Sequence, residues 1–391
     1  MSPHLKSLFL LDPEVIFLNH GSFGACPKPV FETYQLWQRK LENQPVAFLG
    51  RDFFEFDRQA RQALGAFLNS AADDLVFVPN TTHGVNIIAR SLALGPGDEI
   101  LTSDHEYGAC DHAWELICKK SGSTYTRQPV PLPTHSSEEL VEQIWQAVTP
   151  RTKVIYLSHI TSPTALHLPV EILCARARQA GILTLVDGAH APGQIALDLQ
   201  AVGADFYTGN CHKWMLSPKG AGFLYARPEV QHLIEPLIVS WGYHVPPHMA
   251  TGSHFLDILQ WTGTRDPAAA FSVAAAIQFM QAHDWQTIQQ TCHDLLGTAI
   301  QRICDLVGMP PPYPLDSQLF HQMGIAPLPP GVDATLLKTR LYEEYRIEVQ
   351  LTEWNDRIFV RISVQAYNTQ SDLDALCNAL EALLPQVEGQ G

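Results

Sequence analysis

The feature that most constrains the fold is an alternation of short apolar runs with helical patterns between residues 75 and 226. Strands that alternate with helices form a mostly parallel sheet covered on both faces. The run ILTLVD at Ile182–Asp187 is apolar almost throughout, as expected of a strand buried on both faces. The pattern therefore predicts an α/β fold, with strands at Leu75–Val78, Glu99–Thr102, Lys153–Leu157, Ile182–Asp187, Asp205–Thr208 and Gly222–Ala226.

The pattern changes after Arg265, where the sequence predicts a smaller α+β domain. We expect helices over Asp266–His283, near Val332–Tyr345 and from Ser371, and a strand pair at Ile347–Leu351 and Arg357–Val364. An N-terminal strand is predicted at Glu14–Asn19. The predicted division is an N-terminal segment (1–26) that bridges to the small domain, a large domain (27–265) and a small C-terminal domain (266–391).

Composition excludes several classes of protein. The 391 residues carry a formal net charge of −15, which argues against nucleic acid or an anionic membrane as the main partner. There is no run of about 18 apolar residues, and the first residues do not read as a signal peptide, so we expect a cytoplasmic protein. The cysteines are scattered without a C-x-x-C pair, and there is no H-E-x-x-H, so no metal site is predicted.

Four polar clusters follow predicted strands, where α/β proteins bind ligands. They are Asn80–Asn86, Asp104–Tyr107, Asp187–His190 and Asn210–Trp214. Three of them have an ordinary explanation: a helix cap for the first, a packed aromatic for the second and an exposed charge for the lysine of the last. Together they supply a phosphate cradle, a stacking aromatic, an aspartate for a pyridinium nitrogen and a lysine for an aldehyde. That combination is what pyridoxal 5′-phosphate requires.

The chain resembles the class V aminotransferase family of fold type I pyridoxal-phosphate enzymes, and within it the isopenicillin N epimerase-like branch. The resemblance runs from L-N-H-G-S-F-G at 18–24, through D-G-A-H at 187–190 and H-K-W at 212–214, to R-I-S-V-Q-A-Y-N-T at 361–369. It implies a large cofactor-binding domain with a mainly parallel, mixed seven-stranded sheet covered by helices, plus the smaller α+β domain. It also implies a homodimer with active sites shared across the interface.

The resemblance assigns roles to individual residues. Lys213 would form the imine with the cofactor, and Asp187 would pair with its ring nitrogen. His190 would hydrogen-bond the ring hydroxyl, and Tyr107 falls where cysteine desulfurases have a stacking histidine. The phosphate would be held by Thr81, Thr82, Asn210 and His212, and by the Gly263-Thr264 loop of the neighbouring subunit.

Substrate binding is predicted at Arg361, Asn19 and His20. On the strand Arg357–Val364, Ile358 and its alternating apolar partners should face a core, and Arg361 should face away from it. In the family, the arginine at this position binds the substrate α-carboxylate, and guanidinium groups bind carboxylates through two hydrogen bonds.

The resemblance implies an enzyme that removes the Cα proton of an amino acid, and the later steps stay open. We favour an epimerase or racemase. The alternatives are a C–S lyase or cysteine desulfurase-like enzyme acting on cysteine, cystine or a hercynylcysteine sulfoxide, an aminotransferase, or a non-catalytic pyridoxal-phosphate-binding protein. The stretch Tyr345–Arg361 contains no cysteine, which speaks against the persulfide mechanism of the desulfurases.

Overall fold

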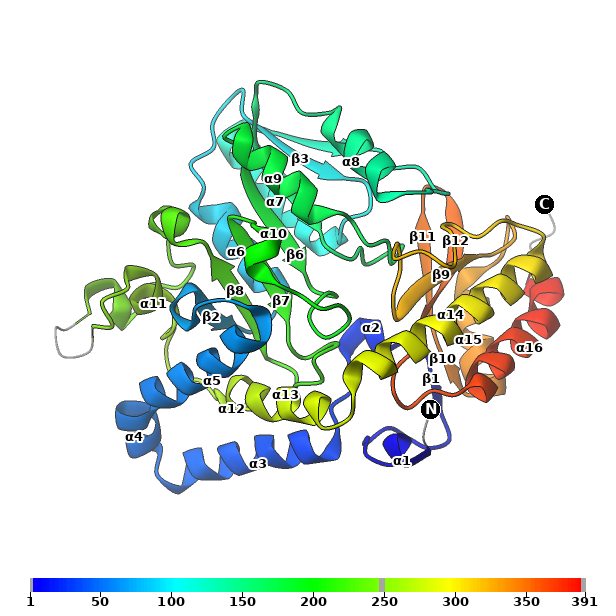
Figure 1. Ribbon diagram of the computed structural model, residues 1–391, viewed down its shortest axis with the longest axis horizontal. Coiled ribbons are helices and arrows are strands. Elements are labelled where there is room, and N and C mark those ends of the chain that lie inside the picture. Colours follow the sequence, from blue (N-terminus) through cyan, green and yellow to red (C-terminus); the bar gives the residue numbers. More distant parts are fainter. Residues whose placement is uncertain (1–2, 246–249, 388–391) are drawn as a thin grey trace.

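A large mixed sheet dominates the computed structural model, which describes residues 3–245 and 250–387 (Figure 1). In these residues it has seven strands in the order β2-β8-β7-β6-β5-β3-β4. Strand β8 runs antiparallel to both of its neighbours, and the other pairs are parallel. The predicted α/β fold is confirmed. In sheet order the strands are Leu75–Val78, Gly222–Ala226, Phe206–Asn210, Leu183–Gly188, Thr152–Ser158, Glu99–Ser103 and Thr124–Gln128.

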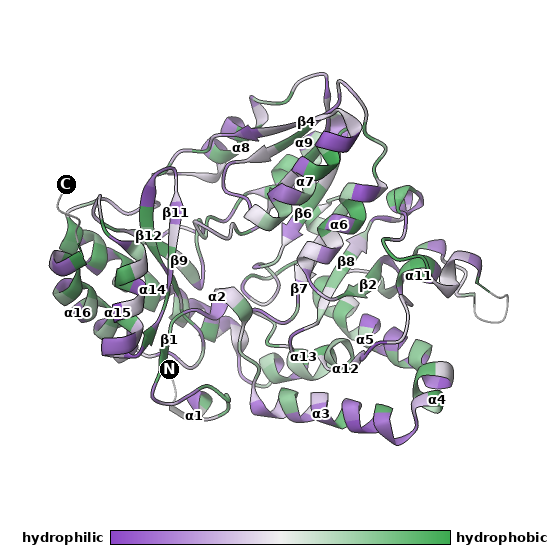
Figure 2. Ribbon diagram, turned by 180° about the vertical axis from the view of Figure 1, so that it is seen from behind, coloured by the Kyte–Doolittle hydropathy of each residue, from purple (hydrophilic) through white to green (hydrophobic). Residues whose placement is uncertain are grey.

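Two apolar cores lie on opposite faces of this sheet. On β5, Val154 and Tyr156 belong to one core, and Ile155 and Leu157 belong to the other, because successive side chains of a strand point to opposite faces. The first face is covered by α6 (Thr81–Ser91), α7 (Gly108–Ser121) and α11 (His254–Leu259); the second by α5 (Phe53–Leu68), α8 (Ser137–Trp145), α9 (Val170–Gln179) and α10 (Leu199–Val202). These helices carry both hydrophilic and hydrophobic residues (Figure 2). None of the described helices is long and apolar enough to cross a membrane.

Two strands were not predicted. Strand β4, Thr124–Gln128, is a polar edge strand that pairs, within the described part of the chain, only with β3 and is partly exposed. It therefore lacks the apolar run of a buried strand. Strand β9, Met323–Pro327, is buried throughout. Its short sequence MGIAP contains a glycine and a proline, which are poor strand formers, so the sequence does not indicate a strand there.

The smaller C-terminal sheet is antiparallel, with the order β11-β12-β9. Strand β11 covers Gln350–Trp354 and β12 covers Arg357–Ser363. The strand predicted at Ile347–Leu351 is in fact interrupted at Val349, because β10 (Ile347–Glu348) pairs in parallel with the N-terminal β1 (Ile16–Phe17). Helices α14 (Trp285–Val307), α15 (Ala334–Tyr345) and α16 (Gln370–Val387) complete this part of the chain (Figure 1).

The helix predicted at Asp266–His283 is divided into α12 (Ala268–Phe271) and α13 (Val273–Gln281). At the break, the Ser272 hydroxyl donates to Ala268 O at 2.7 Å, a bond from serine back into the preceding turn that tends to bend helices. Both helices pack against α3 (Lys28–Asn43) and α5. The shorter helical segments are the α-helices α1 (Pro3–Lys6), α2 (His20–Phe23) and α4 (Pro45–Ala47), the π-helix η1 (Phe48–Asp52), and the 3₁₀ helices η2 (Ala72–Asp74), η3 (Pro228–Leu233) and η4 (Trp241–His244).

Gly24 explains how the N-terminal segment reaches the large sheet. It follows α2 with φ of 70°, a left-handed conformation that favours glycine. A Cβ atom at this position would lie 2.1 Å from the His212 carbonyl oxygen. The segment therefore lies directly against the backbone of His212 and Lys213, and brings α2 to the edge of the sheet where the polar clusters are found.

Candidate active site

The four polar clusters meet in a cavity of about 200 Å³ at one edge of the large sheet. Strands β2, β6 and β7 all end there, because β8 lies between β2 and β7 and runs antiparallel to both. The cavity is lined by Ser22, Phe23, Asn80, Thr81, Thr82, Tyr107, Ser158, Ile160, Ser162, Asp187, Ala189, His190, Asn210, His212 and Lys213. The cofactor-binding residues predicted within one subunit are all among them.

Asp187 lies at the end of β6 and is only 3% exposed. Its Oδ1 accepts a hydrogen bond from Ala189 N at 2.9 Å, and its Oδ2 accepts one from the Tyr156 hydroxyl at 3.2 Å. Burial raises the pKa of this carboxyl above its ordinary value. Oδ2 also accepts from the Cys110 thiol at 3.7 Å. All three hydrogen-bond partners are neutral, so the site offers a buried carboxylate that a cationic ring nitrogen would stabilise.

Lys213 follows β7 and extends its amine into the same cavity. Burial, with a further contribution from the positive charge of Arg361, lowers the pKa of Lys213 to about 7. The amine nitrogen Nζ lies 3.1 Å from His190 Nε2. A lysine that is partly neutral at physiological pH is a nucleophile and can form an imine with an aldehyde.

The first turn of α6 forms an anion-binding corner of the cavity. Asn80 Oδ1 caps the helix by accepting from His83 N at 2.9 Å, and Asn210 Oδ1 accepts from Thr81 N at 2.9 Å. The Thr81 hydroxyl oxygen is buried without a hydrogen-bond partner among the described residues. Backbone N–H groups at a helix start and an unpartnered buried hydroxyl fit a phosphate group.

His212 borders this corner with one ring nitrogen already engaged. Nδ1 lies 3.0 Å from the Ala221 carbonyl oxygen, which can only accept, so Nδ1 carries a proton. Burial lowers the pKa of His212 to about 4. The remaining nitrogen, Nε2, must take up a second proton before it can donate to a phosphate oxygen.

Tyr107 stands immediately before α7 and is 47% exposed, on the wall of the cavity. The preceding residue, Glu106, is buried and anchors this loop. Its carboxyl oxygens accept from the Ser103 hydroxyl at 2.6 Å and from the Ser158 amide and hydroxyl at 2.8 and 2.6 Å. Burial raises the pKa of Glu106 to about 8. The loop that carries Tyr107 is thus held to the end of β5.

Arg361 lies in a second chamber beside the first, with Ser22, Tyr107, Ser162 and Lys213 in the walls of both. It is 5% exposed, and burial lowers its pKa to about 10. Its two terminal nitrogens donate to neutral groups, the Ser162 carbonyl and hydroxyl and the Ser22 hydroxyl. Its Nε is buried without a partner among the described residues. This guanidinium therefore lacks the carboxylate that normally accompanies a buried arginine.

The expectation that one face of β12 points away from the core is only partly correct. Phe359, Arg361 and Ser363 are as deeply buried as Val360 and Ile362. Strand β12 is the central strand of its sheet, and its Arg361 face meets α2 and the loop around Ser162. An alternating pattern cannot distinguish a solvent-facing side from a side that faces another domain.

Asn19 and His20 do not line either chamber, and their predicted part in substrate binding stays a prediction. His20 is fully buried, with Nε2 donating to the Lys213 carbonyl at 3.1 Å and Nδ1 2.9 Å from the Tyr367 hydroxyl. Asn19 Oδ1 accepts from the Ser22 hydroxyl at 2.6 Å. Both residues therefore support the residues that face the cavity. The Gly263-Thr264 loop also lies outside both chambers of its own chain, and its contact with a neighbouring subunit stays a prediction.

Sequence reasoning missed Ser22 and Ser162, which hold Arg361. The signals were present. Ser22 lies inside the N-H-G-S-F-G motif, and Ser162 follows the buried strand β5 in the polar run S-H-I-T-S-P at 158–163. Polar residues at the end of a buried strand were considered for four clusters, and the run after β5 is a fifth.

Comparisons with known proteins agree with this geometry. The Aminotransferase class-V family model matches residues 24–376. An isopenicillin N epimerase of Amycolatopsis lactamdurans is 34% identical over 95% of this chain and 96% of its own length. A probable chloroplastic L-cysteine desulfhydrase of Arabidopsis thaliana is 26% identical over 95% of this chain and 84% of its own length.

The fold also matches solved structures. The apo structure of a cysteine desulfurase from Thermococcus onnurineus NA1 superposes with a TM-score of 0.82 at 20% identity, over 98% of both chains. The family match covers most of the sequence, and the cavity brings together the side chains that the sequence predicts to bind the cofactor of this family. The chain therefore belongs to the class V aminotransferase family and is a pyridoxal phosphate-dependent enzyme.

Proposed function

We propose that this enzyme moves the Cα proton of an amino acid, as an isopenicillin N epimerase-like epimerase or racemase. One observation carries the proposal. Arg361 is a buried guanidinium with only neutral partners, and it shares a chamber with the amine of Lys213. A substrate α-carboxylate bound to Arg361 would supply the missing negative charge. It would also place the substrate Cα within the region that Lys213 reaches.

The residues of the first chamber would hold the cofactor. Lys213 would bind its aldehyde carbon, Asp187 would face its ring nitrogen and Tyr107 would stack on its ring. When bound, pyridoxal phosphate supplies an electron sink for the charge left at Cα. The carboxylate of Asp187 would keep the ring nitrogen protonated, because a buried carboxylate is stabilised by an adjacent cation.

The α6 corner would hold the phosphate. The unpartnered Thr81 hydroxyl, the Thr82 hydroxyl and the Thr82 amide would supply donors, while the Thr81 and His83 amides already donate to Asn210 Oδ1 and Asn80 Oδ1. His212 would add a donor once Nε2 is protonated, and a phosphate dianion favours that protonation.

Lys213 would also be the acid–base group. Its pKa of about 7 means that the amine is neutral in a substantial fraction of molecules near neutral pH. A neutral amine can remove a proton and its ammonium form can return one, and groups with a pKa near the working pH do this most effectively. Arg361 contributes by binding the carboxylate and, through its positive charge, by lowering the pKa of Lys213.

A C–S lyase that acts on cysteine or cystine is the second candidate, because a desulfhydrase is among the relatives. The epimerase is favoured, since the identity to that relative is 34% and the identity to the desulfhydrase is 26%. The absence of cysteine between Tyr345 and Arg361 also argues against persulfide transfer. The non-catalytic alternative is set aside because the family is one of enzymes.

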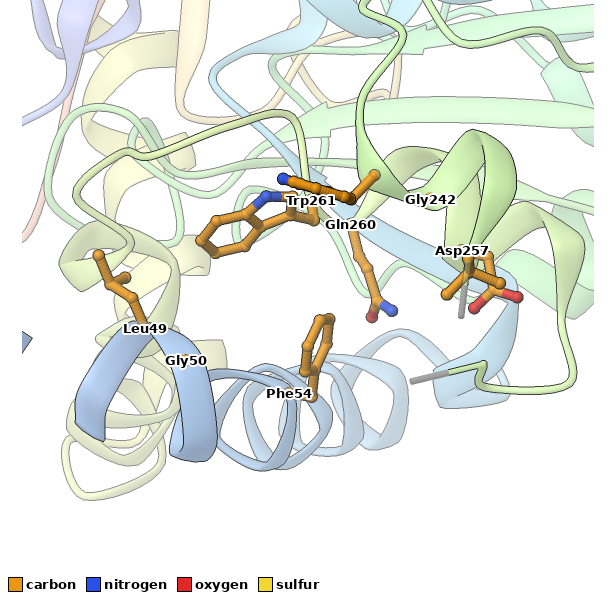
Figure 3. Close-up of a pocket in the computed structure, with 9 residues that line it drawn as sticks. Leu49, Gly50, Phe54, Gly242, Asp257, Gln260 and Trp261 are labelled. Carbon is orange, nitrogen blue, oxygen red and sulfur yellow. The ribbon is translucent and has the colours of Figure 1, made fainter. Parts of the chain in front are cut away.

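We also propose a homodimer. Exposed apolar side chains gather in the segment that precedes the Gly263-Thr264 loop, including Ile238, Val239 and Trp241. Next to them lies a mainly apolar pocket of about 300 Å³, in which Leu49 and Phe54 point toward Trp261 (Figure 3). Exposed apolar patches of this kind are typical of protein interfaces.

The dimer is tested by sedimentation of the purified protein. Val239→Asp should shift the protein toward monomer and weaken retention of the cofactor, because it places a charge in the proposed interface. Leu10→Asp is the matched control, since Leu10 is also exposed but lies in the N-terminal segment. A wild-type monomer that retains its cofactor would contradict the proposal.

The reaction is tested by incubating the cofactor-loaded enzyme with a panel of single enantiomers, including isopenicillin N, alanine and cystine. An epimerase gives the opposite configuration at Cα with no other product. A lyase gives pyruvate with a sulfur product, and an aminotransferase gives a keto acid. Pyruvate and sulfur release without any epimer would replace the epimerase with the second candidate.

A further inference from the structure

The imidazole of His190 lies between two nitrogen groups, one on each side of the ring. The indole Nε1 of Trp214 lies 3.3 Å from His190 Nδ1, and Lys213 Nζ lies 3.1 Å from His190 Nε2. His190 and Trp214 are both buried, with exposed fractions of 2% and 0%. The geometry of both contacts is therefore set by the protein and not by solvent.

The indole group determines where the histidine carries its proton. An indole N–H can donate a hydrogen bond but cannot accept one, so His190 Nδ1 must be the acceptor and carry no proton. The neutral ring then carries its single proton on Nε2. The other tautomer would place two N–H groups head to head in a buried site.

The charges around the ring favour its neutral form. Burial and the nearby positive charges of Lys213 and Arg361 hold the pKa of His190 well below its ordinary value, with His20 acting in the same direction. The Nε2–H group points at the amine of Lys213. A neutral amine has a lone pair to accept this bond, and an ammonium has none.

We propose that Trp214 is a positioning residue that fixes His190 as an Nε2–H donor toward Lys213 and toward the ring oxygen of the bound cofactor. The inference rests on the proposed role of Lys213, but the tautomer itself is a property of the cofactor-free protein. Trp214 acts only through His190. Its loss removes the selection between tautomers while both side chains of the cavity, His190 and Lys213, remain present.

The direct test is ¹⁵N–¹H NMR of the histidine rings in cofactor-free protein, with the His190 signals assigned by their loss in His190→Gln. Wild type should show His190 protonated at Nε2. Trp214→Phe should show a mixture of tautomers, because phenylalanine has no N–H. Retention of the Nε2–H tautomer in Trp214→Phe would overturn the proposal.

Trp285→Phe is the matched control, since it also removes a buried indole hydrogen bond, the one from Nε1 to Gly193 O at 3.2 Å. It should leave the His190 signals unchanged. If Trp214→Phe does not fold, as judged by circular dichroism, β-(3-benzothienyl)alanine at position 214 replaces it. That residue keeps the bicyclic shape without an N–H, and the same two outcomes apply.

A second measurement follows the apparent pKa of Lys213 in cofactor-free protein through the ¹³C signal of its Cε. Loss of the donor should raise this pKa by up to about one unit, or tenfold in the proton-binding constant, because the neutral amine loses a hydrogen bond. An unchanged pKa in a variant with mixed tautomers would overturn the link from Trp214 to Lys213. Neither measurement requires turnover, so the outcome is independent of whether the enzyme is an epimerase.

Discussion

Arg361→Lys is the substitution that most directly tests whether Arg361 binds the substrate α-carboxylate. Arg361 is held by Ser22 and Ser162 through its two terminal nitrogens, and its Nε is unpartnered. Lysine keeps the positive charge but has one nitrogen in place of three, so it cannot keep the serine contacts and also bind a carboxylate through two bonds.

The expected cost is that of one charge-assisted hydrogen bond, about 1.5–3 kcal/mol. This corresponds to substrate binding that is weaker by roughly 10- to 150-fold. Cofactor binding should change little, because the phosphate corner is formed by the Thr81 turn and His212 on another part of the cavity wall. The strand should persist, since Val360 and Ile362 remain in its core.

The assay is a spectral titration of the bound cofactor with a reactive amino acid and, in parallel, with the corresponding amine that lacks the carboxylate. Wild type should strongly prefer the acid, and Arg361→Lys should lose most of that preference. Arg357→Lys is the matched control on the same strand, because Arg357 does not line the chamber. Equal discrimination by wild type and Arg361→Lys would show that the carboxylate is bound elsewhere.

Two further predictions follow from the first chamber. Asp187→Asn should keep the cofactor bound but slow Cα deprotonation on the order of 100-fold or more, because a neutral amide cannot hold the ring nitrogen protonated; near-normal deuterium exchange at Cα would contradict this role. The pKa of Lys213 is lowered to about 7, so the rate at which cofactor-free protein captures pyridoxal phosphate should rise with pH through about 7 and then level off. Stopped-flow absorbance measures this rate. A rise centred near the ordinary lysine pKa would show that the pKa of Lys213 is not lowered.

The large domain was predictable because its strands are buried on both faces. Runs such as Ile182–Asp187 are apolar along their whole length, and polar residues follow them where the strands end. The proximity of Asp187 and Lys213 was also expected from the sequence. Each follows a predicted strand, and the carboxyl ends of parallel strands meet at one edge of the sheet, where α/β proteins bind ligands. The polar edge strand β4 was missed because none of its residues is buried, so its sequence lacks an apolar run.

The parts that could not be predicted depend on contacts between distant segments. The sequence motif that contains Asn19 and His20 was associated with substrate, but these side chains support Ser22 and the Lys213 backbone from behind the cavity wall. Motif membership does not reveal which way a side chain points. The burial of both faces of β12 likewise depends on where the small domain packs, and no local pattern records that position.

The proposal that the enzyme inverts an amino acid by moving its Cα proton is most directly tested in deuterium oxide, by following the Cα hydrogen of one enantiomer. With wild type, we predict that the opposite enantiomer accumulates and carries deuterium at Cα, and that Lys213→Ala abolishes both inversion and exchange while the fold is retained. Chiral chromatography with mass detection reports configuration and isotope together. Deuterium-free substrate with unchanged configuration, alongside pyruvate and a sulfur product, would contradict the account.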